Sequence, residues 1–505
     1  MTNETQAHII FRSIHGTFWL IVGRTASLVA GIAATVFIVR KLGPEQYGYI
    51  PLINSILGMA MIVADGGLGP STAFYLARYR NRNAAVSRLL TKTVWLRLIT
   101  LVPVCILFYA LIPSAAVFFS VPIFAGCLPI FMAGLLMALA LSRWTEKAYA
   151  GLGEAGRLGK FQTCFSLASP ICQALLVSMG FGVLGVIAGQ VAANGALVIV
   201  LLLAMLLKFR RAAVKDTECA DVVSSLAVIR YAMPLMVIHG SLFVFTQSAV
   251  LVLKYYHSIQ EVSYYGLIAQ IAVLTQIPAL SLASATAPMI ATLNQEKPER
   301  ASALLGLSLR SLVIAYAPLV AFTALAAPAI ITHVFSVEFL SAVPILRIYA
   351  PYILFYALGG FASMSLDYEG KARLRMWLVA GGALANLAFC FLLIPRHGTM
   401  GAAVATLVSH LPLIVTYLLL LKRVYRISVR RLPRFGLSIA LATAVSALLL
   451  HTMLAYSPDS LPSLILGILI ASVCYLVLLL MVGIINLHEI RAVLKSGGIL
   501  SALVK

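Results

Sequence analysis

Two charged residues stand inside long apolar runs of the sequence, where a side chain needs a partner or water. Arg24 lies within the first run, and Asp65 lies within the second, just before Gly66-Gly67. An arginine in the middle of a membrane helix costs about 3 kcal/mol on insertion scales, so Arg24 is expected to face other helices or a polar cavity. Its helical face carries Thr17, Ser27 and other small residues. Two roles are open for Arg24: contact with an anionic group of a ligand, or a buried pair that joins helices.

Asp65 has three possible roles. It lies at a depth similar to that of Arg24, so the two side chains can form a pair that an anionic cargo would disrupt. An acid in the membrane also marks proton or cation pathways. The glycines that follow it are expected to break or bend the helix, and Asp65 then caps the break or forms a static pair.

Three further cations lie near the ends of apolar runs and are candidates for a substrate cavity. Lys254 ends the seventh run on the side expected outside, where it offers a charge for release of a ligand. Arg97 and Arg310 lie inside the third and ninth runs, near the ends expected in the cytoplasm, and form a candidate cationic rim. The alternative for all three is a long side chain that reaches from the membrane to the headgroups.

Four charged residues follow the fourth run and form a candidate gate or coupling network. They are Arg143, Glu146, Lys147 and Glu154, and the alternative is a solvated charge cluster. His239, near the middle of the seventh run, is a candidate proton relay or a hydrogen-bonded core residue.

The composition requires that membrane helices position these residues. Hydrophobic residues make up 61% of the 505-residue chain and charged residues only 10%, whereas a soluble domain carries about 25%. This excludes a soluble enzyme, a collagen, a coiled coil and a disordered chain. The continuously apolar runs favour helices over strands. The predicted fold is therefore an all-α polytopic membrane protein of about 14 transmembrane helices. The runs cover residues 14–39, 46–76, 89–112, 116–142, 161–179, 183–207, 227–253, 262–292, 302–332, 341–366, 374–395, 399–421, 435–456 and 461–486.

The net charge of +21 is explained by the membrane topology of the chain rather than by a nucleic-acid partner. When the N-terminus is placed in the cytoplasm, the outside loops hold few of the 37 lysines and arginines, namely Arg40, Lys41, Lys254, Arg347 and Arg396. Such an excess inside predicts that both termini are cytoplasmic. The cysteines and histidines show no metal-ligand spacing, so we expect no metal site and no cofactor.

Weak internal matches predict two parallel repeats of six helices. Three pairs of short motifs recur along the chain at a nearly constant offset, each at the same place in a set of six runs. They are Gly182-x-x-Gly185 with Gly398-x-x-Gly401, Glu154 with Glu369, and Tyr47-Gly48 with Tyr265-Gly266. Repeats of this kind are typical of transporters that rock around a central cavity. We expect an N-terminal lobe at 1–215, a second lobe at 216–430, and an appended helix pair with a cytoplasmic tail at 431–505.

Three stretches resemble the signatures of a known family. The segment from Arg40 to Gly48 is similar to the Leu-Gly-x-x-x-Tyr-Gly signature of polysaccharide exporters. The segment from Asn386 to Thr406 resembles that family's Asn…Leu-Ile-Pro-x-x-Gly-x-x-Gly-Ala-Ala-x-Ala-Thr run, and Val334 to Arg347 is a weaker match. The chain thus resembles the Wzx-type oligosaccharide-lipid flippases of the MOP exporters, whose relatives include lipid II flippases and MATE transporters.

The resemblance implies a protein of the bacterial inner membrane that moves an oligosaccharide on undecaprenyl pyrophosphate from the cytoplasmic to the periplasmic leaflet by alternating access. Arg24 would then contact the pyrophosphate. Membrane lipids, and the polymerase and assembly proteins of a polysaccharide pathway, are the expected partners, and coupling to H⁺ or Na⁺ stays open. Two alternatives remain: a cation-coupled multidrug antiporter of the same superfamily, or a polytopic polymerase or ligase. The sparse acids in the membrane and the short outer loops disfavour both.

Overall fold

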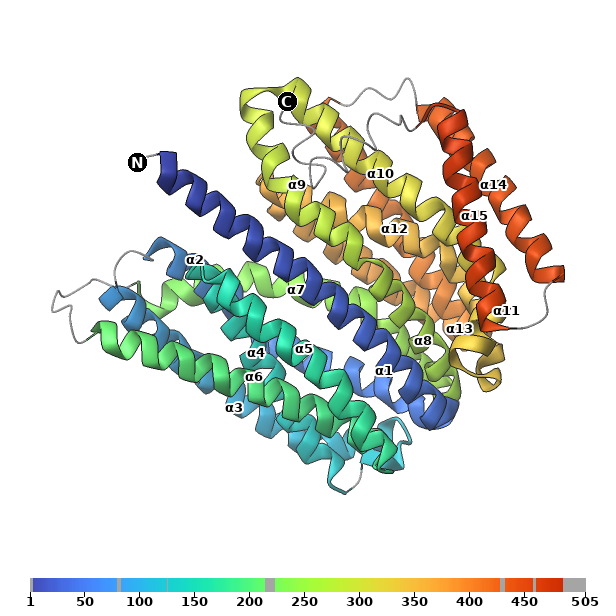
Figure 1. Cartoon of the computed structure of the whole chain (residues 1–505). Coiled ribbons are helices and arrows are strands. Elements are labelled where there is room, and N and C mark those ends of the chain that lie inside the picture. Colours follow the sequence, from blue (N-terminus) through green and yellow to red (C-terminus); the bar gives the residue numbers. More distant parts are fainter. Residues whose placement is uncertain are drawn as a thin grey trace. The chain divides into compact units, whose positions relative to one another are not determined.

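The structure, a computed structural model, describes residues 3–79, 83–124, 126–213, 223–426, 432–456 and 460–484, with side chains for most residues from Val29 onwards. Within these ranges the chain is helical and has no strand, as predicted. Among the described residues, 12 helices are long and apolar enough to cross a membrane. Figure 1 follows them from α1 in blue to α15 in red.

Fourteen apolar runs fit into these 12 helices because two of the helices hold two runs each. The helix α1 (Asn3–Asp65) turns back at Gly43, where φ is 68° and ψ is 177°. The helix α13 (Ala372–Tyr425) turns back at Gly398, where φ is 53° and ψ is −132°. Both glycines have a positive φ, which a residue with a Cβ atom avoids. They explain why glycine stands in the first two family signatures.

Two helix ends test the predicted boundaries. The break after Asp65 is confirmed, since α1 ends there and α2 (Leu68–Arg78) begins beyond two glycines with positive φ. The fourth run, predicted at 116–142, begins later than expected. The helix α3 (Asn83–Phe118) continues to Phe118, and α4 (Leu128–Gly151) follows a turn that contains Ser120, with φ of 52°. The turn is mostly apolar, so composition alone does not mark it.

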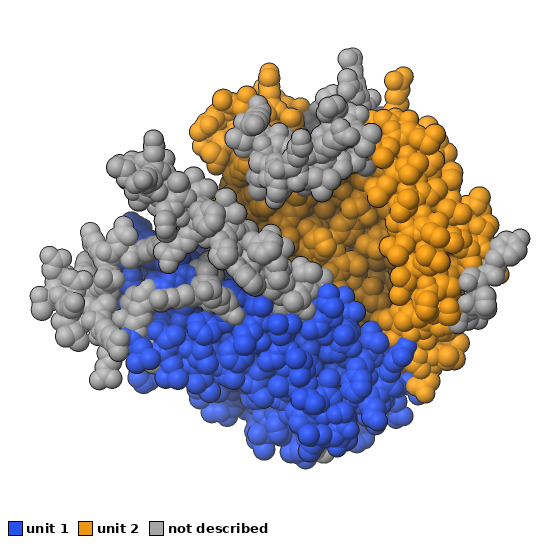
Figure 2. Space-filling model, viewed as in Figure 1, with its two compact units in different colours: residues 1–263, 379–398 blue, residues 264–378, 399–505 orange. Residues whose placement is uncertain are grey.

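The chain divides into two compact units, which Figure 2 colours blue and orange. Unit 1 comprises residues 1–263 and 379–398, and unit 2 comprises 264–378 and 399–505. The predicted repeats at 1–215 and 216–430 describe sequence similarity and stay a prediction. The compact units have different bounds because α7 (Ser225–Tyr256) packs within unit 1.

The remaining helices of unit 1 surround α4, which packs against α2, α3 and α6. The helix α5 packs against α6 and α1. The bounds of these elements are η1 Pro122–Phe124, α5 Ala155–Ser178 and α6 Gly182–Ala213.

Glycines allow α7 to lie against α1 and α2 within unit 1. A Cβ atom on Gly58 of α1 would overlap the Phe243 ring, and one on Gly240 of α7 would lie 3.1 Å from Ile62. Near the start of α7, Ser71 of α2 donates to the Val228 carbonyl at 2.8 Å. Close backbone approach and hydroxyl bonds of this kind are how membrane helices associate.

In unit 2, α9, α10 and α12 pack together, and α14 and α15 form a pair that rests on α10. Tyr475 of α15 donates to the Ile314 carbonyl of α10 at 3.0 Å, which fixes the pair. The bounds are α8 Ile259–Thr275, which begins in unit 1, α9 Ile277–Glu296, α10 Pro298–Leu325, α11 Ala327–Ala329, η2 Ile330–Phe335, η3 Val337–Ala342, α12 Val343–Tyr368, α14 Leu432–Tyr456 and α15 Leu461–Met481.

Candidate functional site

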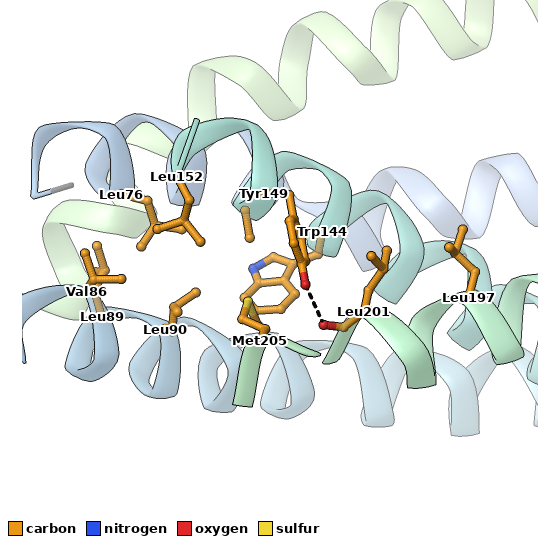
Figure 3. Close-up of a cluster of buried hydrophobic side chains, with 11 residues drawn as sticks. Leu76, Val86, Leu89, Leu90, Trp144, Tyr149, Leu152, Leu197, Leu201 and Met205 are labelled. Atoms are coloured by element: carbon orange, nitrogen blue, oxygen red, sulfur yellow. Dashed lines mark hydrogen bonds between the residues drawn. The ribbon is translucent and has the colours of Figure 1, made fainter. Parts of the chain in front are cut away.

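The end of α4 has an apolar face and a charged face. On the apolar face, Trp144 donates to the Thr72 hydroxyl of α2 at 3.2 Å, and Tyr149 donates to the Leu201 carbonyl of α6 at 3.0 Å. Figure 3 shows these two rings among the leucines of the same core, with Val86 and Met205. With this face fixed in the core, Arg143 and Lys147, one helical turn apart, are held exposed on another face. Packing of α4 therefore presents two cations together.

Glu146 completes the charged face. It is half-buried and accepts a hydrogen bond from the Gln162 amide of α5 at 3.2 Å. Its charged neighbours are Lys147 and Arg143. We call Arg143, Glu146 and Lys147 the charged face of α4. With two cations and one acid, this face is net positive and suited to an anionic group.

Arg97 of α3 is fully buried beside the broken end of α1. Its guanidinium donates to the Asp65 carboxylate at 3.1 Å and to the Asp65 carbonyl at 3.0 Å. It also donates to the Ala64 carbonyl and, at 2.7 Å, to the Ala140 carbonyl of α4. The last carbonyls of a helix lack partners in the helix itself, and a cation there is favourable. Arg97 thus caps α1 at the glycine break.

The capped break and the charged face of α4 adjoin at Gly69. A Cβ atom on Gly69 would lie 3.4 Å from the Lys147 side chain and 3.7 Å from the Asp65 carboxylate. Arg97 is 0% exposed and forms an ion pair with Asp65, so its charge is already compensated within the protein. Arg143 and Lys147 are exposed and can meet a ligand. Among the described residues, no cluster of histidine, cysteine or acid could hold a metal ion.

The structure places the other predicted site residues as follows. The Arg24 side chain lies outside the described side chains, so its two roles stay open. Asp65 pairs with Arg97. Lys254 is half-buried in the last turn of α7. His239 lies on an exposed face of α7, so it is not a core residue.

Arg310 lies in unit 2, on α10, with its guanidinium carbon 5.6 Å from the centre of the Phe435 ring of α14. This is a cation–π contact between the appended helix pair and the rest of the unit. Arg97 belongs to unit 1. The proposed rim of Arg97 and Arg310 therefore stays a prediction, but Arg97 is not at a surface.

Sequence reasoning missed a buried polar network in unit 2. The His410 ring of α13 contacts the Tyr352 hydroxyl of α12 at 2.9 Å through Nε2 and the Thr406 carbonyl at 2.9 Å through Nδ1. Thr406 also bonds the Tyr265 hydroxyl of α8 at 2.9 Å. His410 stands in the apolar run 399–421, where a histidine is a signal that sequence reasoning can use.

Sequence reasoning also missed a group of turns at one end of unit 1. His257, between α7 and α8, contacts the Glu261 carboxylate at 3.4 Å and the Ile394 carbonyl of α13 at 2.8 Å. The sequence holds one signal for this group. Glu261 stands 215 residues after Gln46, and Glu369 stands 215 residues after Glu154.

The fold is similar to known transporters at low sequence identity. A lipid II flippase, MurJ, in an inward closed conformation is 15% identical, with a TM-score of 0.69, over 91% of this chain and 97% of that chain. A MATE-family multidrug resistance transporter of the MOP superfamily is 16% identical in its inward-facing conformation, with a TM-score of 0.61, over 80% of this chain and 96% of that one. An outward-facing structure of a MATE-family transporter has a TM-score of 0.56 at 16% identity, over 82% and 95%.

Sequence comparison identifies the family. No curated protein matches the chain. The profile of the family described as "Polysaccharide biosynthesis protein" matches residues 13–294, more than half of the sequence. The turn at Gly43 lies within this match, and the helical fold is similar to those of MurJ and a MATE-family transporter. The chain is therefore a membrane protein that belongs to the polysaccharide biosynthesis protein family.

Proposed function

We propose that the protein is a flippase of the bacterial inner membrane that moves an oligosaccharide, linked to undecaprenyl pyrophosphate, from the cytoplasmic to the periplasmic leaflet. The observation that carries this proposal is the charged face of α4, which presents Arg143 and Lys147 in a chain with only 10% charged residues. Membership of a polysaccharide biosynthesis family and the MurJ-like fold support it.

The physical task explains why such a face is needed. A sugar–pyrophosphate headgroup loses its water in hydrocarbon, and each unsatisfied polar group costs several kcal/mol. The prenyl tail is apolar and stays in lipid. Exposed cations replace part of the lost hydration of the pyrophosphate through charge-assisted hydrogen bonds. No bond is made or broken, so no catalytic group is required.

The multidrug antiporter alternative requires an acid in the membrane that is free to bind a cation. Asp65 is bonded to Arg97 at 3.1 Å, and Asp367 is bonded to Arg375 at 2.7 Å. Each of these two carboxylates is therefore paired with an arginine of the protein itself. This arrangement supports an anionic cargo over a cationic one.

The test measures undecaprenyl-linked intermediates by mass spectrometry in a strain that lacks the gene, with an external glycosidase to report which leaflet holds them. We expect complete repeat units to accumulate on the inner leaflet and the wild type to restore their transfer. Arg143→Gln and Lys147→Gln should each slow transfer severalfold, and the double variant should slow it further. Arg423→Gln, at an exposed cation in the last turn of α13, is the matched control and should transfer normally.

One outcome would overturn the flippase proposal, and a second would remove the charged face of α4 from it. If repeat units reach the outer leaflet without the protein but stay unpolymerised, the protein acts after translocation, as a polymerase or ligase. If Arg143→Gln/Lys147→Gln transfers at the wild-type rate at a normal protein level, the charged face of α4 does not bind the cargo, and Arg24→Gln becomes the variant to test.

A further inference from the structure

Four turns of unit 1 meet at one end of its helices. A Cβ atom on Gly48, just after the α1 turn, would overlap the Ile259 carbonyl oxygen at the start of α8. A Cβ atom on Gly182, at the start of α6, would lie 3.3 Å from the Gln46 side chain. We call these turns, with the α13 turn at Gly398, the turn cluster. The distribution of lysine and arginine predicts that this end faces outside.

The two halves of the chain build the turn cluster in the same way. Gly182 and Gly398 both have a φ of 53°. Gly182 faces Gln46, and a Cβ atom on Gly398 would overlap a Glu261 carboxylate oxygen. Glu261 follows Gln46 by 215 residues, the offset that separates Glu154 from Glu369. The two sites are therefore equivalent, but one holds a neutral amide and the other a carboxylate.

Only the second site adds an imidazole. His257 follows Leu42 at the same offset, so an apolar residue takes its place in the first site. His257 lies between two membrane helices, α7 and α8, and its side chain is 22% exposed, beside a Glu261 side chain that is 32% exposed. Both groups can exchange protons with water.

The contacts of the imidazole call for a proton on each ring nitrogen. Nε2 lies 2.8 Å from the Ile394 carbonyl, which only accepts, so Nε2 carries a hydrogen. Nδ1 lies 3.4 Å from the Glu261 carboxylate. In a neutral ring of this tautomer, the Nδ1 lone pair would face the lone pairs of the carboxylate. One added proton turns this repulsion into an attraction, whichever of the two groups holds it.

Among the described residues, the other charged groups at this end do not contact the ring. They are Arg40, Lys41 and Glu45 on α1, Lys254 on α7, and Arg396 and His397 on α13, next to the turn; Arg40 and Lys41 are exposed. Glu45, Arg396 and His397 are exposed, and Lys254 is half-buried. The polar contacts of the His257 ring are the Glu261 carboxylate and the Ile394 carbonyl.

We propose that His257 and Glu261 form a proton-binding site that holds the turn cluster closed when a proton enters from outside. The added proton joins α13, through Ile394, to the start of α8, through Glu261. Its loss returns the repulsion between the ring and Glu261, which turns the ring and weakens the bond of Nε2–H to Ile394, so the turns separate more easily. The inference depends on the geometry of the turns and not on the cargo.

The test measures the distance between spin labels placed on the two halves of the turn cluster. Met179, before the α6 turn, and Leu392, on α13, are exposed at 70% and 62% and accept labels. The full chain, with its native cysteines replaced and transport confirmed, is studied in nanodiscs by pulsed electron resonance, without cargo. We expect one short-distance population at pH 5.5 and a severalfold larger long-distance population at pH 8.0.

Three variants assign the response to the site. In His257→Gln, the amide can still donate to Ile394 but carries no titratable proton, so the pH response should vanish. Glu261→Gln copies the neutral first site and should weaken the response severalfold. His397→Gln removes a neighbouring exposed histidine and should behave as the wild type. The proposal is overturned if the unmodified pair shows no pH response, if His257→Gln keeps it, or if His397→Gln abolishes it. None of these outcomes bears on the flippase proposal, which is measured by transfer of cargo.

Discussion

Arg97 joins three helices of unit 1 through one guanidinium, and Asp65 is its only acidic partner among the described residues. The side chain begins on α3, bonds the carboxylate of Asp65 at 3.1 Å at the end of α1, and reaches the Ala140 carbonyl of α4 at 2.7 Å. A planar fork of five donors can satisfy several acceptors at once, which an ammonium group cannot do in the same fixed geometry.

Arg97→Gln is therefore expected to lower the free energy of unfolding by about 3–5 kcal/mol, because Asp65 and two or more carbonyls lose their buried donor. Arg97→Lys should recover only a small part of the loss. Thermal unfolding in nanodiscs, followed by helical circular dichroism, measures both. A matched control is Arg347→Gln, whose residue is exposed and whose Nε lies 3.4 Å from the Ala324 carbonyl. A wild-type melting temperature for Arg97→Gln would contradict the structural role.

Gly48→Ala tests the close approach of the α1 turn to the start of α8. The added methyl would overlap the Ile259 carbonyl oxygen, and backbone cannot yield as a flexible side chain does. Overpacking of this kind costs about 1–3 kcal/mol. Gly195→Ala in α6 is the control, since nothing lies within 4 Å of its added Cβ, and the change should stabilise the helix by up to about 1 kcal/mol. Equal melting temperatures for the two variants would show that the turns do not touch.

The sequence was sufficient to predict the helical fold, because membrane helices are specified by long apolar runs. The broken helix after Asp65 was also predictable, since two successive glycines interrupt an apolar run. The start of α4 was not, because the turn around Ser120 is as apolar as the helices beside it. Hydropathy measures transfer into lipid and contains no information on backbone direction.

The partner of Asp65 could not be predicted from depth along the sequence. Arg24 and Arg97 both stand in apolar runs, and the choice between them depends on which helix lies beside the end of α1. In the structure, the helix beside the end of α1 is α3, so Arg97 is the partner of Asp65. Likewise, the exposed position of Arg143 follows from the packing of Trp144 into the core, which a charge count does not reveal.

Tyr352→Phe tests the buried network of unit 2. With Nδ1–H of His410 donating to the Thr406 carbonyl, Nε2 accepts from the Tyr352 hydroxyl at 2.9 Å. Removal of the hydroxyl deprives a buried acceptor of its donor and should destabilise the protein by about 1–3 kcal/mol. Tyr368→Phe, at an exposed tyrosine of the same helix, should change stability by less than about 0.5 kcal/mol. The melting temperatures of both variants are compared by thermal unfolding. Equal losses of stability would show that the network does not stabilise the protein.

Arg310 has two alternative roles, and one pair of variants distinguishes between them. If its contact with the Phe435 ring is its main role, Arg310→Gln should cost about 0.5–1 kcal/mol, and Phe435→Leu should remove the same contact. A double-mutant cycle would then show a coupling of similar size, measured by unfolding, while the transfer of lipid-linked repeat units stays normal. If Arg310 instead forms part of a cationic rim for the cargo, Arg310→Gln should slow transfer and Phe435→Leu should not. We expect the first result, because the guanidinium lies 5.6 Å from the centre of the aromatic ring of α14.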